Sequence, residues 1–324
     1  MSYMPRWRAL IAALVAASTL AACGGGGDST GGASAVSANT APTDIPAAPS
    51  AVPGVSAPTA SGNIALDGRN WINYRRAQAG VPTVTENVLI NNAALGHSEY
   101  LRTNNLMSHD QKPGSQGFTG ATLKDRLNAA GYIIPVNGYA YGEVISGTSN
   151  GDGFYMAEEL ITAIYHRFVM FEPKFREIGT GAARSAGGYH YFTADFAARG
   201  GFGPGIAVNS IVTWPYSGQA AVTPNFMSDS EDPDPVQGIN EVGYPISVHA
   251  NIDAVVAMQT FTVRPRGAAN LQVQVVNSSA DPARRTAVAI VPLAPLKART
   301  TYDVCFAGTV NGTPVTRDWS FTTR

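Results

Sequence analysis

Residues 93–109, AALGHSEYLRTNNLMSH, hold the pattern that decides the fold of this chain. Apolar residues recur every three or four positions in their first part, which predicts an amphipathic helix over about 86–104. His97 lies on or beside the inward stripe of that helix, and His109 follows it after an apolar pair. Two interpretations of His97 stay open, a hydrogen-bonded core histidine and a member of a site.

Two more polar residues interrupt apolar segments further along. Glu143 stands in a strand-like segment, 139–146, and His166 stands near the end of a helix predicted over 154–168. A buried carboxylate is costly in free energy unless it is paired. Glu143 is therefore expected to have a partner, and His109, Glu143 and His166 are the three polar residues that stand out in this stretch.

The elements around these residues predict the fold class. Helices are expected over 64–79, with Asp67 as a start signal, and over 122–130. Strands are expected over 175–181 and 189–196. Helices first and strands late favour an α+β fold with helices packed on a mostly antiparallel sheet.

The chemistry of the three polar residues allows several uses. Two neutral imidazoles and one carboxylate are the protein ligands of an open zinc site, in which bound water becomes a nucleophile. The same side chains can act without metal as an acid and a base, or can simply hold a loop, a strand and a helix together. Their spacing matches no short metal motif. Arg126 and Arg167 are expected to form surface ion pairs.

The order of these motifs resembles a bacterial CAP domain, from the superfamily of cysteine-rich secretory proteins, antigen 5 and pathogenesis-related 1 proteins. The resemblance covers about 62–203 and implies an α-β-α sandwich with a His/Glu cleft that binds zinc or another divalent cation in some members. The residues that carry it are Asn73-x-Arg75, Ala94-x-x-His97-Ser98-x-Tyr100, Ser108-His109, Gly142-Glu143 and His166-Arg167 ahead of Gly179-x-Gly181.

The resemblance also implies roles for single residues. His109 and His166 take the places of the two cleft histidines and Glu143 that of the cleft glutamate, which makes these three the candidate metal ligands and catalytic residues. Valine follows Glu143 where asparagine is usual. No motif selects a second glutamate; Glu159, together with His97, is a secondary cleft candidate. No serine or cysteine nucleophile motif is present.

Composition excludes some classes of function. The formal net charge is −1, so the chain offers no electrostatic case for a nucleic-acid partner. The two cysteines, Cys23 and Cys305, exclude a disulfide framework and a cysteine-based zinc site.

The N-terminus predicts export. Residues 1–22 have an arginine-containing start and an apolar run too short to span a bilayer, as in a signal peptide. The run ends Leu-Ala-Ala before Cys23, which resembles the bacterial lipobox and implies lipidation of Cys23; the alternative is an ordinary Ala-x-Ala cleavage site. Residues 23–61, rich in Gly, Ala, Ser and Pro, are expected to be a disordered tether.

The segment 207–324 predicts an all-β sandwich. Short β-rich runs lie at 211–216, 246–250, 261–264, 272–276, 287–292, 301–309 and 316–322. Asn311-Gly312 predicts a hairpin between the last two. The last 40 residues or so resemble bacterial Ig-like modules of surface proteins. The acidic run 229–234 is either a solvated loop or a calcium site.

These observations predict an exported protein, lipid-anchored to the bacterial cell envelope or extracellular. Its membrane contact would be the anchor at Cys23, and its cleft would bind a lipid, a peptidoglycan fragment or a protein. A metal-dependent hydrolase that uses the same cleft is the alternative, and a structural adhesin or spacer is the third hypothesis.

Overall fold

The structure, a computed structural model, describes residues 55–324, which lie within one compact unit. The predicted signal peptide, Cys23 and most of the predicted tether lie outside the described residues. Among the helices of residues 55–324, none has both the length and the apolar character that a membrane crossing needs.

The N-terminal part of the described chain alternates helices and strands. Its elements are α1 (Ile64–Gln78), β1 (Thr85–Glu86), α2 (Val88–Asn104), α3 (Leu123–Ala129), β2 (Ala140–Thr148), α4 (Gly153–Thr162), α5 (Ile164–Met170), β3 (Glu177–Arg184) and β4 (His190–Ala198). The predicted mixture of helix and sheet is therefore confirmed.

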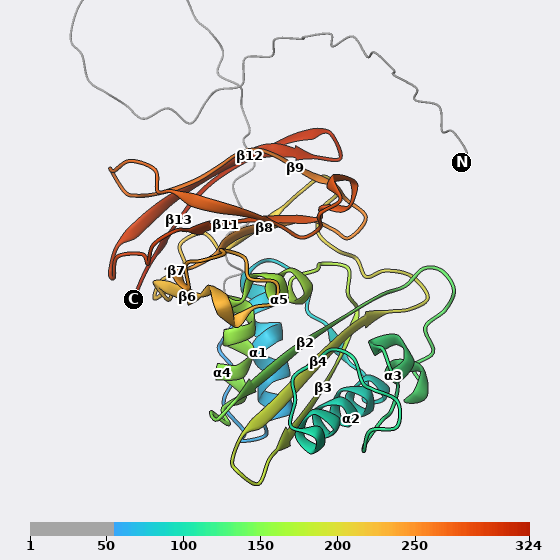
Figure 1. The fold of residues 1–324 in the computed structure, drawn as a ribbon. Helices are drawn as coiled ribbons and strands as arrows, with labels where there is room; N and C mark the ends of the chain where they lie inside the picture. Colours follow the sequence, from blue (N-terminus) through green and yellow to red (C-terminus); the bar gives the residue numbers. More distant parts are fainter. Residues whose placement is uncertain (1–54) are drawn as a thin grey trace, which may run out of the picture. The chain divides into compact units, whose positions relative to one another are not determined.

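These elements form three layers, with one sheet between two layers of helices. The strand order is β1-β3-β4-β2, with β1 parallel to β3 and the other pairs antiparallel. Helices α2 and α3 cover one face, and α1, α4 and α5 cover the other (Figure 1). Residues of β2 face the two layers in turn, since Ile145 packs with Tyr100 of α2 while a Cβ at Gly142 would meet Val169 of α5. Glu143 thus faces the α2 and α3 layer.

Side chains at the N-termini explain where several helices begin. Asn63, Asn87 and Asp152 accept backbone N–H groups of α1, α2 and α4, and Thr122 forms a capping box with Asp125 in α3. The predicted start signal of the first helix was wrong. Asp67 lies inside α1 and instead accepts hydrogen bonds from the backbone of Ser61 and Gly62.

The helix predicted over 154–168 is two helices. Ala163 has extended backbone, with φ −69° and ψ 122°, and separates α4 from α5. The Arg167 guanidinium satisfies backbone carbonyls at the end of α4, those of Ile161 (2.5 Å) and Thr162 (3.2 Å). The carboxylate of Glu231, far along the chain, accepts the first N–H groups of α5. The break is stabilised by contacts that a local pattern does not contain.

The C-terminal part is built of antiparallel strands. They are β5 (Val212–Trp214), β6 (Asn225–Met227), β7 (Glu241–Gly243), β8 (Ile246–His249), β9 (Val256–Pro265), β10 (Val273–Asn277), β11 (Ala287–Pro292), β12 (Thr301–Val310) and β13 (Thr313–Thr322), with short 3-10 helices η1 (Ser228–Ser230) and η2 (Pro282–Arg284). The sheets have the orders β10-β11-β8-β5, β13-β12-β9 and β6-β7. Each predicted β-rich run coincides with a strand. Asn311 and Gly312 both have positive φ, as a two-residue hairpin turn requires.

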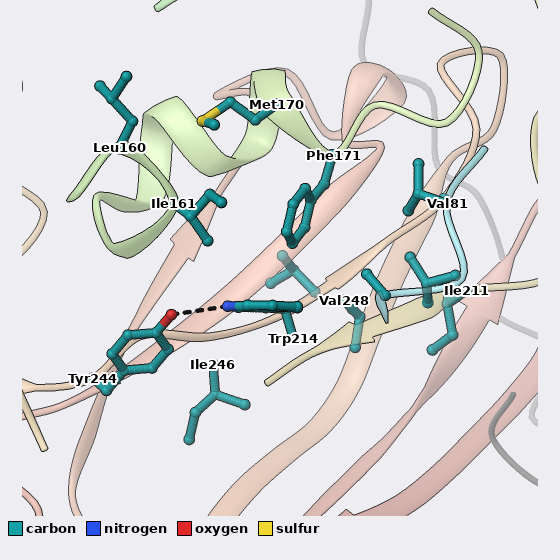
Figure 2. Close-up of a cluster of buried hydrophobic side chains, with 14 of the residues drawn as sticks. Val81, Leu160, Ile161, Met170, Phe171, Ile211, Trp214, Tyr244, Ile246 and Val248 are labelled. Carbon is teal, nitrogen blue, oxygen red and sulfur yellow. Dashed lines mark hydrogen bonds between the residues drawn. The ribbon is translucent and has the colours of Figure 1, made fainter. Parts of the chain in front are cut away.

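One apolar core joins the helices α4 and α5 to the sheet that contains β5 and β8. Trp214 lies at its centre, with the Phe171 ring edge-on at 5.0 Å and the Tyr244 hydroxyl accepting its indole N–H at 2.8 Å (Figure 2). Arg167 is fully buried beside it and donates to the carbonyl of Pro245 at 2.7 Å. The surface position expected for Arg167 is therefore wrong, because its charge is needed at the end of α4.

Candidate functional site

The structure brings His109 and Glu143 together. His109 lies on the loop between α2 and α3, and Glu143 lies on the edge strand β2. The imidazole Nδ1 is 2.9 Å from the carboxylate Oε1. The histidine side chain is 59% exposed and the glutamate side chain 3%, so a buried carboxylate orients a ring that reaches solvent.

Arg126 of α3 completes this pair. Its guanidinium donates to Oε2 of Glu143 at 2.6 Å and to the backbone carbonyl of His109 at 2.8 Å. The side chain of Arg126 is buried, so the surface ion pair expected for it is wrong. Because one guanidinium holds both the carboxylate and the loop, the ring of His109 is fixed relative to Glu143.

The charge of Glu143 follows from its neighbours. Burial raises the pKa of this carboxyl, but the hydrogen bond from His109 and the charge of Arg126 outweigh burial, and the pKa lies below its usual value. An ionised carboxylate only accepts hydrogen bonds, so Nδ1 of His109 carries the donated proton. In the neutral ring, Nε2 is then an acceptor on a side chain that is mostly exposed.

His97 supports the loop rather than the exposed ring. Its Nε2 lies 2.9 Å from the carbonyl of Ser108, and its Nδ1 lies 3.0 Å from the amide nitrogen of Gln111. Burial lowers the pKa of His97 to about 4, which leaves the ring neutral, with Nε2 as donor and Nδ1 as acceptor. His97 also lies 3.9 Å from Glu143. Of its two interpretations, the geometry favours the hydrogen-bonded core histidine.

Asp195 is a member of this cluster that the sequence interpretation missed. It is directly opposite Glu143 in the β2–β4 register and is completely buried. As a carboxylate it would have no donor to either oxygen. Burial and the negative charge of Glu143 raise its pKa well above the usual value, so Asp195 holds a proton that it can donate to Glu143. An acid amid the apolar residues of 191–198 was the signal that could have found it.

His166 does not join Glu143. It lies on α5, in the layer on the other side of the sheet, and its Nδ1 is 3.0 Å from Oε1 of Glu231. The secondary candidate Glu159 is exposed on α4. The pKa of the nearby Tyr155 phenol is raised, mostly by burial and to a smaller extent by the charge of Glu159. The convergence of His109, Glu143 and His166 is therefore not found, because β2 separates the two histidines.

The donor set does not fit the zinc site that the family resemblance implied. Within residues 55–324, no group of three or more His, Cys, Asp or Glu side chains is arranged to hold a metal ion. The expected ligands are divided between two layers, and His97 has both nitrogens occupied by protein groups.

Most of the acidic run 229–234 is exposed, as in the solvated-loop interpretation, but Glu231 has a role that neither interpretation gave it. Glu231 is buried and accepts the backbone N–H groups of Ile164 at 2.8 Å and Tyr165 at 2.8 Å. It is the N-terminal cap of α5, supplied from a distant segment, so it is neither a solvated residue nor a calcium ligand.

A surface cavity of about 390 Å³ lies away from these residues, in the β-rich part of the chain. Its lining includes Asp253, Ser278, Arg284 and Thr286. His109 does not line this cavity, and its ring reaches solvent elsewhere on the surface.

Residues 70–196 match the sequence profile of a family described as CAP, the cysteine-rich secretory protein family. The chain thus contains a CAP domain over these residues, and the class expected from the motifs is confirmed there. No curated protein matches the chain.

Two solved structures are similar to parts of this protein. One is an extracellular protein containing an SCP domain from Bacillus anthracis str. Ames, at 22% sequence identity and a TM-score of 0.35. That match covers 44% of each chain, so this protein spans less than half the length of that relative. The other is an outer surface protein from Borrelia burgdorferi, at 11% identity and a TM-score of 0.34, covering 40% of this chain and 89% of that one.

Proposed function

We propose that this protein is exported, is held on the bacterial cell envelope by a lipid on Cys23, and binds a ligand at His109 of its CAP domain. The signal-peptide pattern of 1–22 and the lipobox-like sequence before Cys23 support the anchor. The tether predicted over 23–61 gives the domain room to reach its ligand.

The observation that carries the ligand site is an exposed imidazole on a buried, ionised carboxylate. Glu143 and Arg126 fix the ring, so little side-chain freedom is lost when a ligand binds. The free Nε2 accepts a hydrogen bond from a hydroxyl or N–H group. Peptidoglycan fragments, lipid headgroups and proteins all present such groups, and the chemistry they share is hydrogen-bond donation.

Nuclear magnetic resonance tests this site. The His109 ring signal would be followed while a soluble muropeptide or phospholipid vesicles are added to the wild-type chain. We expect a saturable shift with one of these probes, and about tenfold weaker binding for His109→Ala and Glu143→Gln. His190→Ala is the matched control, because His190 is a partly exposed histidine at the first position of β4. Equal binding by His109→Ala and His190→Ala would refute the site.

A hydrolase is the second candidate, and one observation favours it. A carboxylate bonded to Nδ1 with Nε2 free is the arrangement of a general base and its orienting group. In this form, His109 would take a proton from an attacking water without metal. Turnover of muropeptides in the presence of a chelator, abolished in His109→Ala, would support it; binding without turnover would leave the ligand-binding function alone.

We also propose that 207–324 is an Ig-like spacer that follows a CAP domain of 62–203. Its stacked antiparallel sheets and the Asn311-Gly312 hairpin support the proposal. A spacer of this kind contributes no chemistry, so substitutions on the exposed faces of β12 and β13 should leave binding at His109 unchanged.

A further inference from the structure

Two loops at one end of the CAP sheet expose large apolar side chains. The first loop joins α3 to β2 and carries Ile133 and Val136, the latter 88% exposed. The second follows β4 and carries Phe202, which is also exposed. Both loops lie at the end of the sheet where β2 begins and β4 ends (Figure 1). We call Ile133, Val136 and Phe202 of these loops, together with the partly buried Tyr139 and the exposed Tyr141 at the start of β2, the loop patch.

The exposure of the loop patch is built into the loop. Tyr132 and Ile134, the neighbours of Ile133, are buried against α2 and α3, so the side chain between them points outward. The backbone N–H of Gly201 donates to the carbonyl of Gly138 at 3.1 Å and ties the two loops together. Apolar side chains held in water over two adjacent loops point to a surface that something else covers.

The surroundings of the patch suit a lipid–water boundary. Tyr139 and Tyr141 stack at 5.8 Å, and the ammonium of Lys124 lies 5.4 Å from the Tyr139 ring. Lys174 lies 5.8 Å from the Phe202 ring but also pairs with Asp253, so the local charge is partly balanced. Aromatic rings with lysines beside aliphatic side chains are the residues that settle at membrane interfaces.

The predicted lipid anchor indicates that a membrane surface is near the loop patch. If Cys23 carries lipid and residues 24–54 belong to the flexible tether that the sequence predicts, their root-mean-square reach would be about 30 Å, on the scale for Gly- and Ser-rich chains. The loop patch would then meet the membrane at a high effective concentration, where a weak apolar contact suffices. We propose that the loop patch inserts into the headgroup boundary of the phospholipid membrane that carries the anchor. This inference rests on the anchor of the proposed function.

The first test uses the mature chain with Cys23→Ser, which carries no acyl group, and vesicles of phosphatidylethanolamine and phosphatidylglycerol. We expect measurable partitioning that survives about 0.5 M salt, since apolar burial is not screened. Val136→Asp should lower the partition coefficient about tenfold. Val208→Asp is the matched control, because Val208 is 82% exposed but lies in a different segment, next to Asn209, which bonds Thr313. Equal losses in the two variants would overturn the proposal.

The second test separates the patch from the anchor. The chain carries an N-terminal hexahistidine tag in place of Cys23 and is held on vesicles with a nickel-chelating lipid. Amide hydrogens of 131–139 and 199–203 should exchange several-fold more slowly than in the free chain, and Val136→Asp should abolish the difference. Unchanged exchange on the vesicle would overturn the patch, including the case in which a protein covers it. An unmodified Cys23 in the native protein, found by mass spectrometry, would instead refute the anchor.

Discussion

Two histidine–glutamate pairs lie on opposite sides of the CAP sheet, and they differ in what surrounds the carboxylate. His109 and Glu143 are 2.9 Å apart, and His166 and Glu231 are 3.0 Å apart. Both carboxylates are buried, but the His109 side chain is 59% exposed and that of His166 is 22% exposed. Glu143 is balanced by an arginine, whereas Glu231 is balanced by the start of a helix.

The two pairs differ in what the carboxylate does. Glu231 uses its oxygens on backbone N–H groups of α5, so His166 is one of several donors to a structural cap. Glu143 has one oxygen on Arg126 and the other on His109, and the ring it orients still offers Nε2 to solvent. The same two residue types therefore hold structure together on one face and, in the proposed function, bind a ligand on the other.

The largest expected effect comes from breaking the structural pair at its carboxylate. Glu231→Ala should lower the free energy of unfolding by about 4 kcal/mol, because buried N–H groups at the start of α5 lose their acceptor. Urea unfolding at neutral pH measures it. Asp229→Ala, in the same acidic run but exposed, is the control and should change stability by less than about 0.5 kcal/mol. A loss no larger than that of the control would show that Glu231 is not the cap.

The second largest effect on stability is expected when the cation beside Glu143, Arg126, is removed. Arg126→Ala should lower the free energy of unfolding by about 3 kcal/mol, since it leaves the Glu143 carboxylate buried without its cation. It should also abolish binding at His109, whose carbonyl the same guanidinium holds. Arg102→Ala breaks an exposed pair with Glu99 and should have little effect on either quantity. Unaltered ligand binding by Arg126→Ala would mean that the loop is positioned by other contacts.

The dependence of stability on pH sharpens the comparison further. The folded-state pKa of Asp195 is raised. Its contribution to the free energy of unfolding is therefore fully present below about pH 4 and is lost as pH rises through the folded-state pKa. Asp195→Asn should remove this loss, at up to about 1.4 kcal/mol per pH unit. Unfolding free energies of both proteins over pH 4–8 measure it.

Glu143→Gln should change the pH dependence of stability in the opposite direction to Asp195→Asn. The folded-state pKa of Glu143 is lowered, so its contribution to the free energy of unfolding is present above the unfolded-state pKa and is lost as pH falls through the folded-state pKa. If both variants shift the pH profile in the same direction, the assignment of the proton to Asp195 is wrong.

The smallest expected effects come from the two histidines themselves. His166→Ala should cost about 1 kcal/mol of stability, because it removes one hydrogen bond to a buried carboxylate. His109→Ala should cost about as much, because it also removes one hydrogen bond to a buried carboxylate, that of Glu143. Ligand binding should separate the two variants: His109→Ala should weaken it and His166→Ala should leave it unchanged. A stability loss in His109→Ala well above that in His166→Ala would assign the His109 pair a structural role as well.

Much of the fold follows from local pattern. Most helices of the CAP domain and seven strands of the C-terminal part were predicted, because periodicity and caps such as Asn87 and Thr122 act locally; the short strands β6 and β7 were missed. The missed break at Ala163 is different. Alanine favours helix, and the groups that stabilise the break, Arg167 and Glu231, act through tertiary contacts.

The site was only half predictable for the same physical reason. His109 and Glu143 stand out as polar residues in apolar segments, and the structure places them together. Nothing local distinguishes His166 from His109, since each acquires its partner from a residue distant in sequence. Asp195 was missed because strand pairing, rather than sequence spacing, brings it opposite Glu143.

The buried contacts of Trp214, Phe171 and Arg167 make the two parts of the chain resemble an obligate pair of subunits that share one polypeptide. Ending the chain after the CAP domain would expose the Phe171 ring to water and would remove the Pro245 carbonyl that Arg167 binds. Cooperative melting in a single transition is the expected consequence for residues 55–324. The β-rich segment thereby supplies part of the core that keeps helices α4 and α5 folded.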